Sequence, residues 1–494
     1  MARSKRVIQK YIDFSGGYQT FTSPLLLQVN ESPFLYNVDI SRPGKLQKAN
    51  GFAQLGSGVG SGANRGVYAW NKEDGTNELY QVYGSDLYKY LGSASGFVSI
   101  GSGFGTGTSP VEWGVSFINT GTGVGTGAET FLERLYITQG IEGEVKYTDG
   151  TSMGTLANVY AKHLEVYKGR LYLGNVKNGT KTYPSRVIFS DVSKDSFPAN
   201  NFFDDIGEAI VGLKEYSGAL FVFTQNKVAA WDEYSLRVIN TNGGTTNKET
   251  VQVTEGRMLW YNRGGVYMYA GGTEGTLISR PVEDWLNVVV NAEEVTGGLD
   301  SRGRYCLYIG DVTYAGTSYS DVVLRYDVLL NAWDVLITRP FKYWTRNKAG
   351  GVYEVYTTNP DGQEVWQIDL GYALNGSAQG SVYQTPKLFG SPENVEDIKN
   401  AYEIQVVYKP SNASEYLTAQ YRIGGTGNWS AIEGSSNNVS LSGTDEIKVE
   451  RLILPPKAAG KFIELKLSHS SSGAGFNLYG LNLIYDVEAK ENHQ

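Results

Sequence analysis

A short aromatic strand pattern returns seven times along the chain, and this repeat limits the possible folds more than any other feature. The seven segments are Leu79–Tyr83, Leu135–Thr138, Leu171–Gly174, Leu220–Thr224, Val266–Tyr269, Cys306–Gly310 and Val352–Tyr356. Their central aromatic residues are Tyr80, Tyr136, Tyr172, Phe221, Tyr267, Tyr308 and Tyr353. These residues recur about every 45 positions, which is the length of one four-stranded propeller blade. The spacing therefore predicts an all-β fold containing a β-propeller.

Several of the aromatic segments form one half of a strand–turn–strand pattern. The segments that show it are Ala219–Trp231, Arg257–Tyr269, Val322–Val335 and Val352–Ile368. A tight turn between two apolar strands is typical of a β-hairpin, so each pair would supply two strands of a blade. We expect six or seven blades, because a glycine-rich insertion at Gly101–Gly127 interrupts the first unit. Only Val282–Ala292 suggests a helix.

Changes in composition divide the chain into three parts. Residues 1–56 show no lasting period and hold several turn residues, which predicts an extended N-terminal arm docked on the rest of the fold. Residues 57–390 carry the repeats and the glycine-rich loop insertions. In residues 391–494, apolar and polar positions alternate along five strands, a pattern typical of a small antiparallel β-sandwich. The five segments are Ala401–Tyr408, Tyr416–Ile423, Ile447–Leu454, Phe462–Leu467 and Phe476–Tyr485.

Charge and composition argue against several classes of protein. The net charge of −8 argues against a nucleic-acid-binding surface, which needs clustered Lys and Arg. It does not exclude DNA passing nearby, because an acidic channel surface would repel the phosphates and let DNA pass without adhering. No apolar run reaches the roughly 18 residues of a transmembrane helix, and no apolar segment follows the basic N-terminus, so we expect neither membrane insertion nor secretion. Cys306 is the single cysteine, which excludes an intrachain disulfide framework and suits folding in a reducing cytoplasm.

No arrangement of residues predicts a catalytic, cofactor-binding or metal site. The histidines His163, His469 and His493 lie far apart in sequence, and we expect His163 at a strand edge. The glycine-rich stretches Gly56–Gly62 and Gly121–Gly127 lack the Lys-Ser/Thr ending of a phosphate loop and are expected to be plain loops. The acids that could serve glycoside hydrolysis are too numerous to single out, and turn-capping is the simpler role. They are Asp191, Asp204, Asp205, Asp232, Glu233 and Asp300.

Tryptophans recur beside the repeated strands. They are Trp231, Trp260, Trp285, Trp333 and Trp366. We expect them to pack between sheets rather than to form a sugar-stacking platform, because buried aromatic rings provide most of the packing in such repeats.

Several motifs together resemble tail nozzle proteins of short-tailed bacteriophages, the tail tubular B and packaged-DNA-stabilisation group. At the N-terminus they are Phe14-Ser15-Gly16-Gly17, Pro24, Asn37-Val38-Asp39, Gly44-Lys45-Leu46 and Gly51-Phe52. Farther along they are Leu220–Trp231, Ser279-Arg280-Pro281-Val282, Leu324-Arg325-Tyr326-Asp327 and Ala332-Trp333. The similarity covers about residues 13–370, but the chain is shorter than many nozzle proteins. Large inserted tip domains are therefore missing, which puts receptor binding at the tail tip in doubt.

The resemblance implies a non-enzymatic structural protein of the virion tail, made in the host cytoplasm. It implies a homo-oligomeric ring, commonly a hexamer, below the portal and adaptor proteins, which retains the genome and lets double-stranded DNA through at ejection without binding it specifically. The alternative is a carbohydrate-directed β-propeller, either a lectin-like binder or a glycosidase acting at a cell envelope. A scaffold that presents one face to partner proteins is a third possibility, which no motif favours.

Overall fold

The computed structural model describes residues 5–23, 25–42, 44–57, 60–105, 107–120, 130–239, 243–387, 398–411, 414–425, 427–432, 438–443, 446–456 and 458–487, and the fold is all-β. The helical elements of these residues are α1 (Glu283–Leu286) and the 3-10 turns η1 (Lys248–Thr250) and η2 (Arg280–Val282). The helix expected over Val282–Ala292 is thus a single turn, because the β-branched run Val288–Val290 disfavours its continuation. Within the described ranges, no helix has the length and apolar character needed to cross a membrane.

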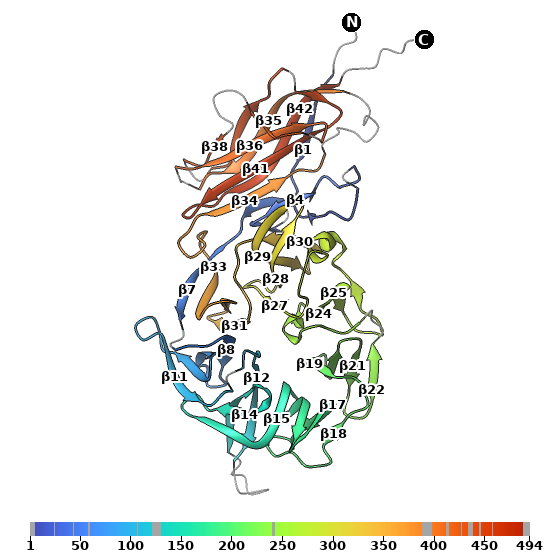
Figure 1. Cartoon of the computed structure of the whole chain (residues 1–494). Helices are drawn as coiled ribbons and strands as arrows, with labels where there is room; N and C mark the ends of the chain where they lie inside the picture. Colours follow the sequence, from blue (N-terminus) through green and yellow to red (C-terminus); the bar gives the residue numbers. More distant parts are fainter. Residues whose placement is uncertain are drawn as a thin grey trace.

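Six sheets follow one another around a ring in chain order (Figure 1). The first contains β8 (Asn64–Asn71), β9 (Asn77–Tyr83), β10 (Asp86–Tyr90) and β11 (Phe97–Ser102). The second contains β12 (Glu112–Asn119), β13 (Phe131–Thr138), β14 (Gly140–Thr148), β15 (Met153–Tyr167), β16 (Arg170–Asn178), β17 (Lys181–Phe189) and β18 (Phe202–Phe203). The third contains β19 (Ile210–Tyr216), β20 (Ala219–Thr224), β21 (Val228–Trp231) and β22 (Leu236–Ile239).

The remaining three sheets complete the ring and return the chain to its start. The fourth contains β23 (Gln252–Thr254), β24 (Arg257–Asn262), β25 (Gly265–Tyr269) and β26 (Thr276–Leu277). The fifth contains β27 (Thr296–Leu299), β28 (Tyr305–Tyr314), β29 (Thr317–Asp327) and β30 (Ala332–Leu336). The sixth contains β31 (Trp344–Ala349), β32 (Val352–Thr358) and β33 (Glu364–Leu370), and it also takes in β7 (Gly51–Ser57) from the N-terminal part of the chain.

The second and sixth sheets explain how the ring is held together. Strand β15 is fifteen residues long, and it pairs with β14 near its start and with β16 near its end, so it joins two four-stranded units. In the sixth sheet, β7 pairs with β33 although more than 300 residues separate them. The first and last sheets also meet directly, because the Ala69 backbone N–H donates to Thr345 Oγ1 at 2.7 Å.

The expected hairpins are confirmed, since the strand pairs β20–β21, β24–β25, β29–β30 and β32–β33 are all antiparallel neighbours. Six of the aromatic marker residues lie on the second strand of their four-stranded unit, whereas Tyr267 lies on the third. One expectation is wrong: the glycine-rich stretch Gly101–Gly127 is not a plain insertion, because it contains strand β12. Within that stretch, Gly121–Gly127 lies outside the described residues, and so does part of Gly56–Gly62.

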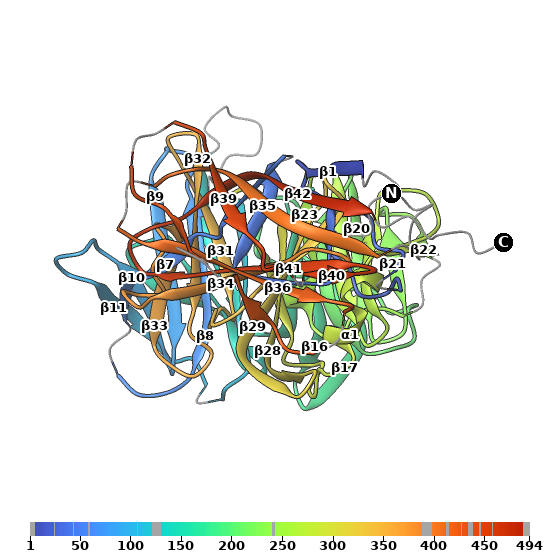
Figure 2. The ribbon, with the colours of Figure 1, turned by 90° about the horizontal axis from the view of Figure 1, so that it is seen from above.

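Two more sheets stack on one side of the ring, next to β30, and carry both ends of the described chain (Figures 1 and 2). One contains β39 (Lys448–Ile453), β35 (Lys399–Lys409), β42 (Asn477–Val487), β40 (Ala459–Gly460), β1 (Lys5–Tyr11), β6 (Lys45–Lys48) and β5 (Val38–Arg42). The other contains β37 (Ser430–Ala431), β36 (Tyr416–Ile423), β38 (Asn438–Ser440), β41 (Ile463–Ser471), β34 (Gln379–Gln384) and β4 (Phe34–Tyr36).

Four strands of the described N-terminal part, β1, β4, β5 and β6, take part in these two sheets. Strand β1 pairs with β42 along its whole length, with Lys5 opposite Val487 and Tyr11 opposite Leu481. Strands β4, β5 and β6 extend the same two sheets, and β2 (Gly17–Tyr18) forms a short parallel pair with β3 (Glu31–Ser32). The five C-terminal segments with alternating polarity all become strands, namely β35, β36, β39, β41 and β42. Their apolar faces merge with that of β28–β30 into one hydrophobic core.

Candidate functional site

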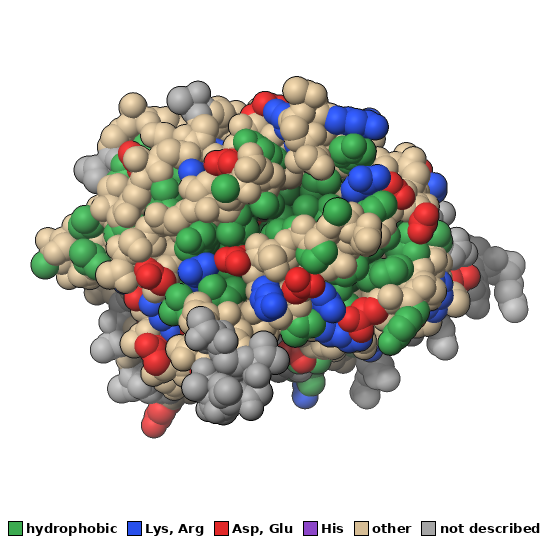
Figure 3. Space-filling view, turned by 90° about the horizontal axis from the view of Figure 1, so that it is seen from below, with side chains coloured by type: hydrophobic (Ala, Val, Ile, Leu, Met, Phe, Trp, Pro, Cys, Tyr) green, Lys and Arg blue, Asp and Glu red, His purple; other side chains and the backbone are tan. Residues whose placement is uncertain are grey.

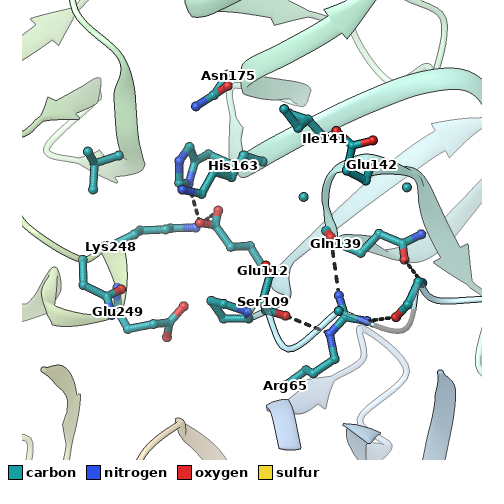
Figure 4. Close-up of a pocket in the computed structure, with 18 of the residues that line it drawn as sticks. Arg65, Ser109, Glu112, Gln139, Ile141, Glu142, His163, Asn175, Lys248 and Glu249 are labelled. Carbon is teal, nitrogen blue, oxygen red and sulfur yellow. Dashed lines mark hydrogen bonds and ion pairs between the residues drawn. The ribbon is translucent and has the colours of Figure 1, made fainter. Parts of the chain in front are cut away.

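The centre of the ring holds a cavity of about 580 Å³, lined mainly where the first strand of each unit begins (Figure 4). We call it the axial cavity, and define it by Arg65, Glu112, His163, Lys248 and Glu249. A second cavity of about 330 Å³ lies farther along the same first strands, beside Tyr68, Lys214 and Arg346. Glu112, Lys248 and Glu249 line both cavities, so these three side chains form the partition between them.

Arg65 fixes one wall of the axial cavity. It lies on β8, is buried, and donates from Nε to the Ser109 carbonyl and from Nη1 to the Gly105 carbonyl, both at 2.8 Å. A longer bond of 3.4 Å reaches the Gln139 carbonyl from Nη2. Burial lowers the pKa of Arg65 from its ordinary value. Because its donors are committed to backbone carbonyls, Arg65 ties β8 to the β11–β12 and β13–β14 connections and serves the fold.

Glu112 is the centre of a buried ion-pair network. One carboxylate oxygen lies 2.6 Å from His163 Nδ1, and the other lies 2.7 Å from Lys248 Nζ and accepts from the Leu164 backbone N–H at 2.8 Å. Burial raises the pKa of Glu112, but Lys248 and His163 lower it more strongly, to about 2. Glu112 is therefore a permanent anion whose acceptors are occupied, which suits a structural role.

Lys248 is held from three sides. Its ammonium group also donates to the Leu164 carbonyl at 2.9 Å and lies 4.0 Å from Glu165, which in turn lies 3.8 Å from Lys214. Burial lowers the pKa of Lys248, yet Glu112 and Glu165 raise it by more. A buried cation with this much compensation stays charged and links β12, β15 and β19 through η1.

Glu249 differs from its neighbours because its carboxylate has no hydrogen bond or ion pair within the described part of the chain. It is placed by η1, which Asn247 begins by accepting the Glu249 backbone N–H on its side-chain oxygen. Burial raises the pKa of Glu249 to about 7; Lys248 and Lys214 lower it, and Glu112 raises it further. At neutral pH this carboxyl group is thus poised between its neutral and charged forms.

The structure scatters the acids that the sequence offered for glycoside hydrolysis. Turn-capping is confirmed for Asp232, which accepts the Tyr234 and Ser235 backbone N–H groups, and for Asp300, which accepts those of Arg302 and Arg304, whereas Asp191 accepts the Ser196 hydroxyl. Asp204 pairs with Arg186 and Glu233 pairs with Lys168, while Asp205 is exposed. None of the six lines the axial cavity.

The histidines and tryptophans are also located. His163 lies on β15 and is 4% exposed; at this position β15 pairs with β16, whereas its pairing with β14 ends at Ala161. His469 lies in the C-terminal sheets next to Glu415, where burial lowers its pKa, and His493 lies outside the described residues. The five tryptophans pack in hydrophobic clusters, as expected. Among the described residues, no group of three or more His, Cys, Asp or Glu could hold a metal ion.

A second cluster of buried charge joins the ring to the C-terminal sheets. Asp39 on β5 accepts Arg304 Nη1 at 2.9 Å and Arg302 Nη1 at 2.8 Å, and Arg304 also donates to Asp300 at 2.7 Å. Burial lowers the pKa of Arg304, but Asp300 and Asp39 raise it to well above its ordinary value. We call this cluster, together with Arg325 and Asp334, the joint cluster.

The joint cluster continues through Arg325 on β29. Arg325 holds Asp334 with two bonds of 2.9 and 2.8 Å and donates to the Val38 carbonyl at 3.3 Å. Asn37 completes the contact, because its backbone N–H donates to the Val335 carbonyl and its side-chain oxygen accepts the Ile337 N–H. Two segments almost 290 residues apart in sequence are thereby fixed to each other.

Sequence reasoning missed Arg65, Glu112, Lys248 and Glu249. The only local signal was the run Pro110-Val111-Glu112-Trp113, where a charged residue interrupts an apolar segment after a proline. Nothing in the sequence indicates that these residues meet, because they come from different sheets.

No protein-family model matches the sequence, and no curated protein matches it. The chain is similar to two solved structures: the extracellular domain of a hybrid two-component system from B. thetaiotaomicron, and PorZ, a surface component of the type-IX secretion system of Porphyromonas gingivalis. The first is 9% identical with a TM-score of 0.38, over 79% of this chain and 47% of that chain. The second is 10% identical with a TM-score of 0.39, over 72% and 44%. The chain thus spans less than half of either structure, and at these scores the likeness carries no argument about function.

Proposed function

We propose that the ring is a seven-bladed β-propeller and that the two sheets beside it form a β-sandwich. Each blade would begin with one of the strands β8, β12, β15, β19, β23, β27 and β31 and continue outward through antiparallel neighbours. Strand β15 would be the fourth strand of one blade and the first strand of the next. The pairing of β7 with β33 supports this view, because an outer strand taken from the other end of the chain is one way to close a propeller.

We propose further that the protein is a non-enzymatic structural component of a short-tailed bacteriophage, a subunit of the tail nozzle ring. One observation carries this proposal. Several of the motifs that resemble nozzle proteins meet around the joint cluster, whereas the Leu220–Trp231 hairpin lies in the third sheet and Pro24 lies outside the described residues. Asp39 and Arg325 belong to that cluster, and an added Cβ on Gly17 would lie 2.5 Å from the Trp333 carbonyl oxygen.

The other resembling motifs support the same joint. Thr20, just after the first motif, donates its backbone N–H to the Pro281 carbonyl at 3.2 Å, and Trp333 Nε1 donates to the Ile278 carbonyl at 3.0 Å. Motifs that share one three-dimensional contact form a single structural unit, and they are harder to explain as separate chance similarities.

In this proposal, DNA passes between copies of the chain rather than through the ring of one copy. The two cavities inside the ring are small, and the ion pairs of Glu112 and Lys248 divide them. A hexamer of subunits below the portal and adaptor would enclose the wider channel, as homo-oligomers favour closed rings. The net charge of −8 would keep the channel wall from adhering to phosphate.

Contacts between copies require apolar surface, and the molecule offers some at the end farthest from the two C-terminal sheets. Figure 3 shows this end, where hydrophobic side chains lie among charges of both signs. Strands of the second sheet expose the large side chains of Phe117, Phe131, Leu132 and Phe202. Exposed aromatic groups with a polar surround are typical of protein–protein contact sites.

The carbohydrate-directed alternative is favoured by one specific observation, the axial cavity. Its volume of about 580 Å³ falls within the range of ligand sites. Two of its four carboxyl groups differ, since the pKa of Glu112 is about 2 and that of Glu249 about 7, and glycosidases pair one ionised with one neutral carboxyl group. However, three donors already occupy the Glu112 oxygens, so Glu112 is a poor nucleophile or base.

The native mass of the purified full-length chain separates the two functions. The nozzle proposal predicts a closed homo-oligomer under conditions that favour assembly, with no hydrolysis of envelope polysaccharides. A stable monomer at every protein concentration, with glycan release that Glu112→Gln abolishes, would favour the carbohydrate-directed function instead.

A further inference from the structure

The axial cavity contains one acidic group, Glu249, whose carboxylate makes no hydrogen bond or ion pair in the described part of the chain. The adjacent Lys248 uses its ammonium group for Glu112 and the Leu164 carbonyl. Glu249 therefore lines the cavity with no bonded partner in the described residues. A carboxylate that has lost much of its water and has no partner is costly, so it must take up a proton or a cation.

The other groups around the cavity that remain available are mostly acceptors. His163 is bound to Glu112 through Nδ1, and its Nε2 is buried without a hydrogen-bond partner in the described part of the chain. At the mouth, Glu142 is 82% exposed and lies 3.2 Å from Lys177 Nζ, and Glu293 lies 3.9 Å from the exposed Arg263; such exposed ion pairs are weak and leave both carboxylates open to another cation. Arg65 faces backbone carbonyls instead. Lys162, on the exposed rim, is the one cation there with its charge available.

The second cavity, in contrast to the mouth of the axial cavity, has additional basic side chains in its lining. It is lined by Lys214 and Arg346 in addition to the three shared residues. A cation would therefore reach Glu249 more easily through the mouth with Glu142 and Glu293 than from the side of Lys214.

We propose that the axial cavity binds a small organic cation, a primary ammonium compound, whose ammonium group pairs with the Glu249 carboxylate. The cavity is far larger than a bare metal ion, and the described residues provide no three-ligand metal set. A short aliphatic diamine fits this chemistry, because its second ammonium group can face the acidic mouth while its methylene groups lie against Ile141 and Val211. This inference goes beyond the nozzle proposal and does not depend on it.

The cation competes with a proton for Glu249, and this gives the binding a pH dependence. The charged and titratable groups that face Glu249 are Lys248 and Lys214, Glu112, and the Tyr343 hydroxyl. Of these, Glu112 stays ionised, and the pKa of Tyr343 is raised by burial and then by Glu249, so the group that titrates near neutrality is Glu249 itself. With a pKa of about 7, its ionised fraction rises about tenfold between pH 6 and pH 8, and the apparent affinity should rise in proportion.

Isothermal titration calorimetry of the full-length chain with 1,4-diaminobutane tests the proposal. We expect binding at pH 8 that is about tenfold weaker at pH 6, and no binding of glucose as a neutral polyol. Glu249→Gln, which removes the charge at nearly constant size, should weaken binding about tenfold or more at pH 8. Glu73→Gln, at an exposed site outside the cavity, should leave it unchanged.

Three results would overturn the proposal: no binding of millimolar diamine at pH 8, equal affinity in Glu249→Gln, or a preference for glucose. If Glu249→Gln does not fold, the ratio of affinities at pH 8 and pH 6 in the unaltered protein decides, since a site without Glu249 would show no such rise. The oligomeric state is measured separately, so failure of this inference leaves the nozzle proposal standing.

Discussion

Replacing Asp39 by Asn tests whether the joint cluster holds the ring and the C-terminal sheets together. The Asp39 side chain is 3% exposed and faces Arg304, which is 6% exposed. The cluster balances three carboxylates against Arg302, Arg304 and Arg325, so Asp39→Asn leaves one positive charge without compensation. Breaking a buried ion pair from one side costs about 3–5 kcal/mol, and we expect the free energy of unfolding to fall by this amount.

Urea denaturation, followed by near-ultraviolet circular dichroism, measures the loss at constant m-value. Glu142→Gln is the matched control, because it removes an acid from an exposed pair with Lys177 at 3.2 Å, which should cost under about 1 kcal/mol. The double variant Asp39→Asn, Arg304→Met should lose less than the sum of the single losses, since it removes both charges of the pair. A loss below about 1 kcal/mol for Asp39→Asn, or simple additivity, would refute the reasoning.

Three further predictions concern single residues. Gly17→Ala should lower the free energy of unfolding by about 1–3 kcal/mol, because φ is +72° there and the new Cβ would lie 2.5 Å from the Trp333 carbonyl oxygen. Gly380→Ala, where an added Cβ meets open space, is the control. Equal melting temperatures for the two variants would contradict this prediction. The pKa of Glu112 is lowered on folding, so the stability that its charge contributes is present above the ordinary value of 4.5 and is lost as pH falls toward 2. Glu112→Gln should therefore remove this pH dependence of the unfolding free energy. An unchanged pH dependence in acid unfolding curves would disprove the role of Glu112. The pKa of Glu249 is raised instead, so the native protein should lose stability as pH rises from 4.5 to about 7. The free energy of unfolding of Glu249→Gln should therefore rise relative to that of the unaltered protein over this interval. Parallel stability curves for the two proteins would contradict this prediction.

The hairpins could be predicted from sequence because their information is local. In Ala219–Trp231, two apolar strands and the turn between them lie within thirteen positions, and the structure pairs them as expected. The four-residue helix α1 was overestimated, since its apolar pattern continued past the point where β-branched residues end it.

The remaining features depend on contacts between distant parts of the chain. No local pattern shows that β1 pairs with β42, more than 460 residues away, or that β7 completes the sixth sheet. Strand β12 was hidden inside a glycine-rich stretch, and with it Glu112. The axial cavity could not be predicted, because Glu112 and His163, on two strands of the second sheet, meet Lys248 of η1 only when the sheets surround one axis.

Electron microscopy of the assembled full-length protein tests the central claim most directly. The account predicts a closed ring of identical copies with an open channel between them, each copy keeping its own small ring filled by the ion pairs of Glu112 and Lys248. Isolated single copies, or an assembly without a continuous axial opening, would contradict it.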